Sequence, residues 1–251
     1  MNQETSFPKE KIKVLLLESI SPSALNSFEH AGYFDVQILN GALSEQELID
    51  ALKGVRVLGI RSKTQLTKKV IQSADKLMSV GCFCIGTNQV DLEAAKEKGI
   101  AVFNAPFSNT RSVAELVIAS TIMLIRGIAE KNQAAHEGVW LKESKNSHEV
   151  RGKKLGIIGY GHIGSQVSVL AESLGLVVYY FDVESKLPLG NANIAESLMD
   201  IIDICDIITL HVPAIPSTVN LFDKKVISCF RPGQYLINMS RGNVVDIEAL
   251  T

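Results

Sequence analysis

Short apolar runs alternate with amphipathic stretches along the N-terminal part of the chain. The runs predict five strands, at 12–17, 35–39, 55–60, 77–85 and 100–103. The stretches between them begin with residues typical of helix N-termini: Ser21 before Pro22, Ser44 in a capping-box pattern with Glu47, Thr67 and Asp91. Because strands and helices alternate, we expect a parallel sheet covered on both faces.

A second pattern of the same kind follows a long apolar stretch. Residues from about Thr110 to His136 predict one long helix that links two domains. Further strands are expected at 155–158, 177–181, 207–210 and 235–238, with helices near 194–202 and 224–229 and a last helix capped by Asp246. We therefore expect an α/β protein with two doubly wound parallel-sheet domains, 1–108 and 109–251. Four strands are two fewer than a dinucleotide domain needs, so the second domain is expected to be incomplete.

Composition and charge exclude several functional classes. A 251-residue chain that is 46% hydrophobic can bury a large core. A net charge of -2 provides no basic surface for nucleic acid or an anionic membrane. The polar N-terminus resembles no signal peptide and no apolar run reaches the roughly 18–20 residues of a membrane span, so a cytoplasmic protein is expected. The cysteines, at 82, 84, 205 and 229, contain a single C-x-C and predict reduced buried thiols and no metal site.

A glycine-rich turn follows the strand at 155–158. Gly159, Gly161 and Gly164 have the G-x-G-x-x-G spacing, and Asp182 ends the next strand. In dinucleotide-binding domains these glycines allow a tight turn, close approach of the pyrophosphate and close helix packing. Asp182 can accept hydrogen bonds from the adenosine ribose and would repel a 2′-phosphate, so we expect NAD in preference to NADP. The alternative is an ordinary strand-to-helix turn.

Other polar residues follow predicted strands, where ligands bind in parallel α/β sheets. Arg61, Ser62 and Lys63 suit an anionic substrate. The alternative is a basic loop that is only solvated and binds nothing. Gly86 allows close backbone approach, or is a plain turn. Asn109 or Thr110 caps the long helix, or binds an anion at its N-terminus. Arg241 can polarise a carbonyl, or forms a surface ion pair.

The five histidines provide no clear catalytic base. His211 follows a strand whose end lines the adenine or pyrophosphate side of a cofactor. His162 lies inside the glycine turn, where its backbone is the relevant group. His30, His136 and His148 are expected at the surface.

Several stretches resemble the D-2-hydroxyacid dehydrogenase family, most closely its bacterial members that act on 3-phosphoglycerate. The stretches are 81–92, 103–116, 152–164 and 186–192. The resemblance implies NAD-dependent oxidation of the C2 hydroxyl of 3-phosphoglycerate to 3-phosphohydroxypyruvate, the first step of serine synthesis. It also implies that 1–108 is a flavodoxin-like substrate domain and 109–251 a Rossmann NAD domain, with the substrate in the cleft. A homo-oligomer through the long helix and the Trp140 region is implied too.

The resemblance assigns roles by position. Arg241 would be the catalytic arginine. The substrate would be bound by Arg61, Ser62, Lys63, Ile85, Gly86 and Asn109. NAD would be bound by Gly159, Gly161, His162, Ile163, Gly164, Asp182, His211, Val212, Pro213, Met239, Ser240 and Arg241.

The chain departs from the family pattern in two ways. Lys63 stands where a second arginine is expected, which keeps the charge and loses the bidentate fork. The family's catalytic histidine and its glutamate partner fall after Thr251, so we expect a fragment without useful catalysis alone. Two alternatives stay open: a dehydrogenase for another 2-hydroxy acid, and a non-catalytic NAD-binding interaction protein.

Overall fold

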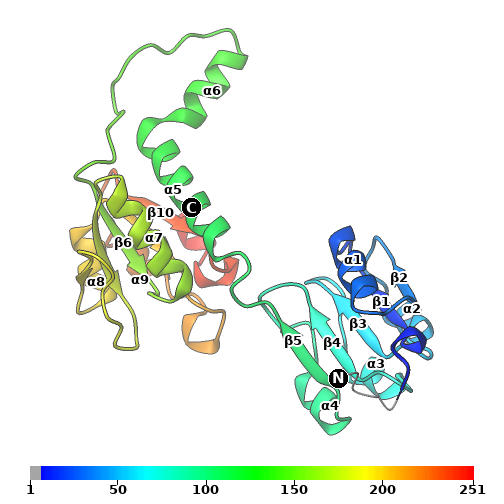
Figure 1. The fold of residues 1–251 in the computed structure, drawn as a ribbon. Coiled ribbons are helices and arrows are strands. Elements are labelled where there is room, and N and C mark those ends of the chain that lie inside the picture. The colour runs from blue at the N-terminus through cyan, green and yellow to red at the C-terminus, as the bar shows by residue number, and fades with distance from the viewer. Residues whose placement is uncertain (1–6) are drawn as a thin grey trace. The chain divides into compact units, whose positions relative to one another are not determined.

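The computed structural model of the protein describes residues 7–251. These residues divide into two compact units, one that ends at Ser108 and one that spans Asn109–Thr251 (Figure 1). Each unit contains one five-stranded parallel sheet with helices packed on it. The α/β class and the parallel sheets expected from the sequence are confirmed.

The sheet of the first unit has the strand order β2-β1-β3-β4-β5. Its strands are β1 (Val14–Leu16), β2 (Val36–Ile38), β3 (Val57–Ile60), β4 (Ser79–Cys82) and β5 (Ala101–Asn104). Every expected strand is present, four of them shorter than predicted, and β5 begins and ends one residue later than predicted. This order is the flavodoxin-like one, in which the direction of winding reverses between β1 and β3.

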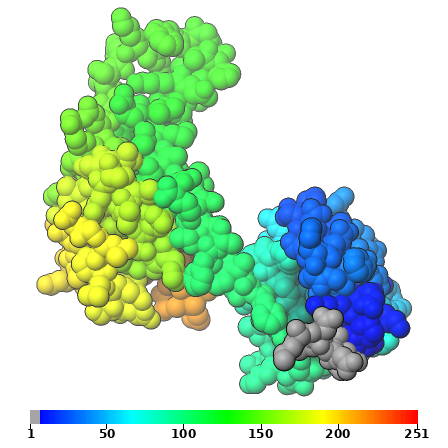
Figure 2. Space-filling view, in the orientation of Figure 1, coloured from blue at the N-terminus to red at the C-terminus, as the bar shows by residue number. Residues whose placement is uncertain are grey.

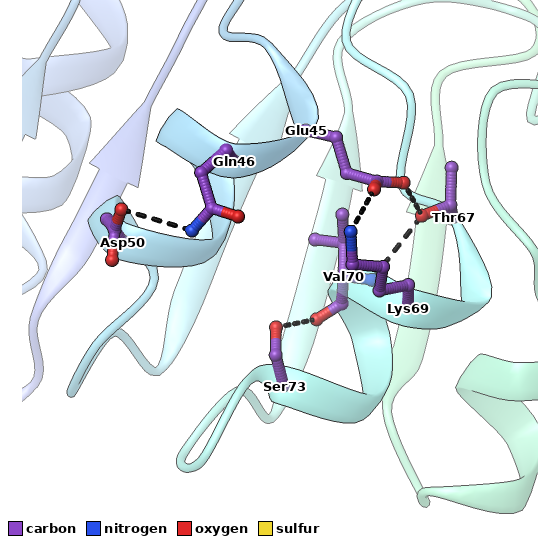
Figure 3. Close-up of polar contacts among 7 residues, drawn as sticks. All are labelled: Glu45, Gln46, Asp50, Thr67, Lys69, Val70 and Ser73. Atoms are coloured by element: carbon purple, nitrogen blue, oxygen red, sulfur yellow. Dashed lines mark hydrogen bonds and ion pairs between the residues drawn. The ribbon is translucent and has the colours of Figure 1, made fainter.

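Side-chain caps begin most helices of the first unit. These are α1 (Pro22–His30), α2 (Glu45–Ala51), α3 (Lys68–Ser73) and α4 (Leu92–Glu97), after the short 3₁₀ turn η1 (Lys9–Lys11). Ser21, Thr67 and Asp91 each accept a backbone N–H of the first helical turn, as the sequence predicts. Figure 3 shows that Glu45 joins α2 to α3, because its carboxylate accepts hydrogen bonds from Thr67 and Lys69 at 2.8 Å each.

The sheet of the second unit has the order β10-β9-β6-β7-β8. Its strands are β6 (Lys154–Ile158), β7 (Val177–Phe181), β8 (Asn193–Ile194), β9 (Ile207–Leu210) and β10 (Tyr235–Asn238). The expectation of four strands is wrong, because Asn193–Ile194 pairs with β7 as a fifth strand. The winding reverses between β6 and β9, as in dinucleotide-binding sheets.

The helices of the second unit differ from the sequence prediction near 194. The unit contains α5 (Thr110–Arg126), α6 (Ile128–His136), α7 (His162–Ser173), α8 (Leu198–Ile204), α9 (Lys224–Ile227) and the 3₁₀ turns η2 (Pro216–Thr218), η3 (Gly242–Val244) and η4 (Glu248–Leu250). The helix expected at 194–202 begins only at Leu198, because Ser197 caps it and Ile194 belongs to β8. Asp246 accepts the N–H groups of Glu248 and Ala249, and starts a 3₁₀ turn.

The single helix expected from Thr110 to His136 is also wrong. Gly127 adopts a left-handed conformation with φ 59° and ends α5, and α6 then starts at a bend of 69°. A left-handed residue ends the α-helical ladder, and glycine adopts that conformation without a steric penalty. The buried side of α5, which includes Val117 and Ile125, packs into the core of the second unit.

The segment after Gly127 stands away from the body of the second unit (Figures 1 and 2). It exposes Ile128, Val139 and Leu141, and Trp140 is 81% exposed. No single helix within 7–251 is long and apolar enough to cross a membrane. The pair α5–α6 meets those criteria only as a bent pair, and α5 is partly buried in the core.

The cysteines are reduced, and two of the four are buried. Burial raises the pKa of Cys82 to about 11 and that of Cys205 to about 12, so both stay protonated at neutral pH. Cys84 is half-buried. The expectation that all four are buried is wrong for Cys229, which lies exposed just after α9.

Candidate cofactor and substrate sites

The glycine turn between β6 and α7 is shaped by close backbone contacts. Gly159 has φ +91°, and a Cβ there would lie 2.6 Å from the carbonyl oxygen of His211. A Cβ on Gly164 would overlap the carbonyl oxygen of Gly159. A Cβ on Gly161 would meet nothing within 4 Å. Two glycines therefore close the turn, and the third leaves open space above the N-terminus of α7.

The N-terminus of α7 can receive an anion at this open position. Gly161 is its N-cap residue and gives it no side-chain cap. A helix N-terminus carries partial positive charge and N–H groups that bind phosphate. His162 and Ile163 form the first turn, His162 exposed and Ile163 half-buried. The residues of this turn fit a dinucleotide pyrophosphate.

Asp182, directly after β7, is tied to the glycine turn by its carboxylate. Its Oδ2 accepts the N–H of Tyr160 at 2.7 Å, and its Oδ1 accepts the N–H of Glu184 at 2.9 Å. Each carboxylate oxygen has a second lone pair, so the ribose hydroxyls can still be bound. A cation lies close by: the ion pair with Glu184, together with the charge of Asp182, raises the pKa of Lys186.

A pair of stacked tyrosines supports the same region, and the sequence analysis missed it. The rings of Tyr160 and Tyr180 lie 3.7 Å apart at 18°. The hydroxyl of Tyr160 accepts the N–H of Leu189, and that of Tyr180 donates to the carbonyl of Lys186. The 183–191 segment is thereby fixed beside Asp182. The aromatic residue inside the glycine motif was the only signal for this contact in the sequence.

His211 follows β9 and is not a surface base. Its Nε2 lies 3.0 Å from the hydroxyl of Thr209, and its buried Nδ1 has no hydrogen-bond partner among the described residues. Burial lowers the pKa of His211 to about 4. A group this weakly basic is neutral at pH 7 and is a poor proton acceptor. Val212 and Pro213 continue the chain past it, and Val212 also borders Gly159.

The low pKa of His211 predicts a pH-dependent stability. An unfolded histidine has a pKa near 6.5, so between pH 6.5 and 4 the unfolded chain gains a proton that the folded chain does not. The free energy of unfolding should therefore fall by about 2–3 kcal/mol through this group as the pH drops across that window. In urea unfolding, the free energy of unfolding should fall less between pH 6.5 and pH 4.5 in His211→Asn than in the wild type. An equal fall in the wild type and His211→Asn would contradict the lowered pKa of His211. The control is His30→Asn, because His30 is exposed.

Arg241 lies in a turn just after β10. The side-chain carbonyl of Asn238 accepts the N–H and the hydroxyl of Ser240, and its amide donates to the carbonyl of Arg241. The guanidinium of Arg241 is exposed and donates to the carbonyl of Ser240 at 3.0 Å. Met239 is half-buried against the core. The turn presents the guanidinium at the carboxyl edge of the sheet, two strands from β6.

Asn109 stands at the start of α5, in the second unit. It is the N-cap residue by position, but its side chain makes no capping hydrogen bond. Its Oδ1 is buried without a partner among the described residues. The simple capping role that the sequence left open is therefore wrong for Asn109, and its amide can bind a ligand.

The cationic loop of the first unit borders a cavity of about 390 Å³ at the carboxyl edge of the sheet. Arg61, Ser62 and Lys63 directly follow β3 and are exposed. The other lining residues follow β1 and β2: Glu18, Ser19, Asn40, Gly41 and Ala42. The cavity thus lies at the point where the winding of the sheet reverses, which is where open α/β sheets bind ligands.

Ile85 and Gly86 follow β4 on the neighbouring loop. The amide of Asn104 donates to the carbonyl of Ile85 at 2.7 Å. The carbonyl of Gly86 accepts from the thiol of Cys84 and from the amide of Gln89. The loop is held by side chains, and the structure places it on the same edge as the cationic loop.

A larger cavity, of about 520 Å³, lies at the opposite edge of the second sheet. Its lining includes His148, Lys153 and Asp206, and the last two directly precede β6 and β9. Ligands of open α/β sheets bind at the carboxyl ends of strands, so we do not place the cofactor there. Within 7–251 no group of three or more histidine, cysteine, aspartate or glutamate residues could hold a metal ion.

Comparisons with known proteins identify the family of the chain. The family model for the catalytic domain of D-isomer specific 2-hydroxyacid dehydrogenases matches residues 14–241. The chain belongs to this family. The D-3-phosphoglycerate dehydrogenase of Escherichia coli K12 is 55% identical to it over 98% of this chain and 60% of that enzyme. The chain thus spans about three fifths of the length of this curated relative.

Solved structures share the fold of this chain. A protein from Thermus thermophilus superposes with a TM-score of 0.88 at 29% identity, covering 95% of this chain and 77% of that one. An NAD-dependent formate dehydrogenase from Staphylococcus aureus, solved in complex with NAD, superposes with a TM-score of 0.79 at 28% identity, covering 95% and 76%. The likeness extends over both units.

Proposed function

We propose that the protein is an NAD-dependent oxidoreductase that oxidises the C2 hydroxyl of 3-phosphoglycerate to 3-phosphohydroxypyruvate, the first step of serine biosynthesis. The observation that carries the proposal is the pairing of a phosphate-binding glycine turn with Asp182, in a chain 55% identical to an enzyme named D-3-phosphoglycerate dehydrogenase. Membership of the 2-hydroxyacid dehydrogenase family supports the reaction class.

The second unit would bind the cofactor. Gly161 and the N-terminus of α7 would receive the pyrophosphate, and Asp182 would bind the adenosine ribose. His211, Val212, Pro213, Met239 and Ser240 would line the rest of the dinucleotide, mainly through their backbone. Bound NAD would supply the hydride acceptor. The NAD complex of the structurally similar formate dehydrogenase supports this choice of cofactor.

Cationic and amide groups would bind the substrate's acidic groups. Arg61 and Lys63 carry positive charge beside a polar cavity, and Gly86 lies on the neighbouring loop. Asn109 would donate from the amide nitrogen of its side chain, which makes no capping hydrogen bond, and Arg241 would add its exposed guanidinium. Arg241 would bind the carboxylate and stabilise negative charge that develops on the C2 oxygen. Lys63 supplies a point charge and cannot form the two parallel hydrogen bonds that an arginine guanidinium makes with an oxyanion. It therefore selects for a phosphate less strongly than an arginine would.

Oxidation of NADH by the protein from its native gene tests the substrate. With 3-phosphohydroxypyruvate as acceptor, kcat/KM should exceed that with pyruvate by at least about a hundredfold, because pyruvate offers no phosphate to the cationic loop. A preference for pyruvate would favour a dehydrogenase for another 2-hydroxy acid. Saturable NADH binding without turnover of either acid would favour a non-catalytic NAD-binding protein.

We also propose that the protein forms a homo-oligomer through the α5–α6 and Trp140 region. The exposed apolar side chains of that segment, Ile128, Val139, Trp140 and Leu141, support it, because such side chains commonly mark interfaces. Light scattering that gives the mass of a single chain would contradict it. The expected cytoplasmic location stays a prediction.

A further inference from the structure

The buried polar side chains of the first unit gather around one loop. Within residues 7–108 they are Glu18, Thr64 and Gln89, all of them buried. Burying polar groups costs free energy unless hydrogen bonds compensate for the lost water. Here they converge on Arg61–Thr64, the loop that carries the cationic side chains.

Glu18 binds this loop from the β1 side. Its Oε1 accepts the N–H groups of Arg61 and Thr64 at 3.0 and 2.9 Å, and its Oε2 accepts that of Lys63 at 3.0 Å. Burial alone would raise the pKa of Glu18, but hydrogen bonds from Thr64, Lys63 and Arg61 outweigh it and lower the pKa. The carboxylate is therefore ionised at neutral pH, in the form that accepts all three bonds.

The backbone at Glu18 is itself unusual. Glu18 and Ser19 have φ of 61° and 53°, a left-handed conformation that costs free energy in residues with a Cβ. The N–H of Glu18 donates to the carbonyl of Gly41, and the hydroxyl of Ser19 donates to that of Asn40. The turn after β1 is thus anchored to the end of β2, and this geometry directs the carboxylate of Glu18 to the loop after β3.

Gln89 binds the same loop from the other side. Its side-chain amide donates to the carbonyl of Arg61 at 2.8 Å and to that of Gly86 at 3.3 Å. Its backbone carbonyl accepts the N–H of Leu66. One buried amide therefore joins the Arg61 loop to the Gly86 loop. These are the two segments of the first unit expected to bind substrate.

We propose that Glu18 and Gln89 are positioning residues that hold the Arg61–Thr64 loop in its anion-binding conformation, a role that rests on the proposed function. The two side chains hold the backbone of the loop, so the side chains of Arg61, Ser62 and Lys63 face outward. Both act through the backbone of the loop. Their contribution is to fix the cationic groups before an anion arrives, which lowers the ordering cost of binding.

The sign of the effect separates positioning from simple electrostatics. A carboxylate beside an anion site repels the anion, so neutralising a mere bystander would tighten anion binding. Loss of a positioning residue would weaken it, because small displacements of binding groups are costly. Glu18→Gln keeps the size of the side chain, removes the charge and replaces one acceptor by a donor that faces a backbone N–H.

The test is the dissociation constant for 3-phosphoglycerate, measured by NMR titration of the wild type and variants under conditions where urea unfolding shows each to be folded. We expect Glu18→Gln and Gln89→Met to raise the dissociation constant at least about tenfold. Glu45→Gln is the matched control: it also removes a carboxylate that accepts two hydrogen bonds in this unit, but away from the loop (Figure 3).

Three results would overturn the inference. If Glu18→Gln binds 3-phosphoglycerate as tightly as the wild type, or more tightly, Glu18 is a bystander and the proposed function is unaffected. Wild-type protein that fails to bind 3-phosphoglycerate at millimolar concentration would overturn both. Should Glu18→Gln fail to fold, Gln89→Met decides the question without a change of charge, and unaltered binding by it would reject the positioning role.

Discussion

Gly161→Ala should weaken NADH binding at least about tenfold without unfolding the protein, because a methyl group would fill the space meant for the pyrophosphate. The new Cβ meets nothing within 4 Å in the structure. The cost to stability should stay within about 1 kcal/mol, the usual loss when alanine replaces glycine at a helix N-cap.

Gly164→Ala should lower both the stability of the protein and its NADH affinity. Its Cβ would overlap the carbonyl oxygen of Gly159 and lie 3.1 Å from Ile157. Helix α7 would have to move off β6, so the free energy of unfolding should fall by about 1–3 kcal/mol, and NADH binding should be lost with it. Fluorescence titration with NADH and urea unfolding of both variants give the two quantities. Gly161→Ala with unchanged NADH affinity would contradict a pyrophosphate site at this turn.

Asp182→Asn should lower NADH affinity by about ten- to a hundredfold, the range expected when hydrogen bonds to a charged group lose that charge. NADPH affinity should hold or improve, because the carboxylate no longer repels a 2′-phosphate and Lys186 lies close by. The preference for NADH over NADPH should therefore shrink sharply. Titration of each nucleotide into the wild type and the variant measures it.

Asp206→Asn is the matched control for this substitution. Asp206 also accepts a backbone N–H, that of Lys154, but at the opposite edge of the same sheet. It should leave both nucleotide affinities unchanged. Because Asp182 also holds the N–H of Tyr160, unfolding of each variant separates a local charge effect from loss of structure. Equal preference for NADH in the wild type and Asp182→Asn would remove Asp182 from the ribose site.

Local signals explain which elements could be predicted from sequence. The caps at Ser21, Thr67 and Asp91 act within a few residues, and the structure confirms them. The break at Gly127 was missed because a single glycine is tolerated inside a helical pattern, and only packing decides its conformation. The strand Asn193–Ile194 was missed because two residues carry no periodicity.

The site residues also differ in how well the sequence predicts their contacts. The glycine turn and Asp182 share one strand–helix–strand unit, so their spacing alone indicated that they lie together, and the hydrogen bond from Tyr160 places them so. Glu18 lies more than forty residues from the loop that it holds, as the sequence positions show. Nothing in the sequence near Glu18 marks it as a buried carboxylate. Contacts of this kind depend on the strand order, which brings β1 beside β3.

Titration of NADH into isotope-labelled protein, followed through the backbone amides, is the most direct test of cofactor binding at the glycine turn. We expect saturable binding with the largest chemical-shift changes at Gly161, Ile163 and Asp182, at the carboxyl edge of the second sheet. Saturable binding with the largest shifts elsewhere, such as around Lys153 and Asp206 at the opposite edge, would contradict it. So would the absence of binding.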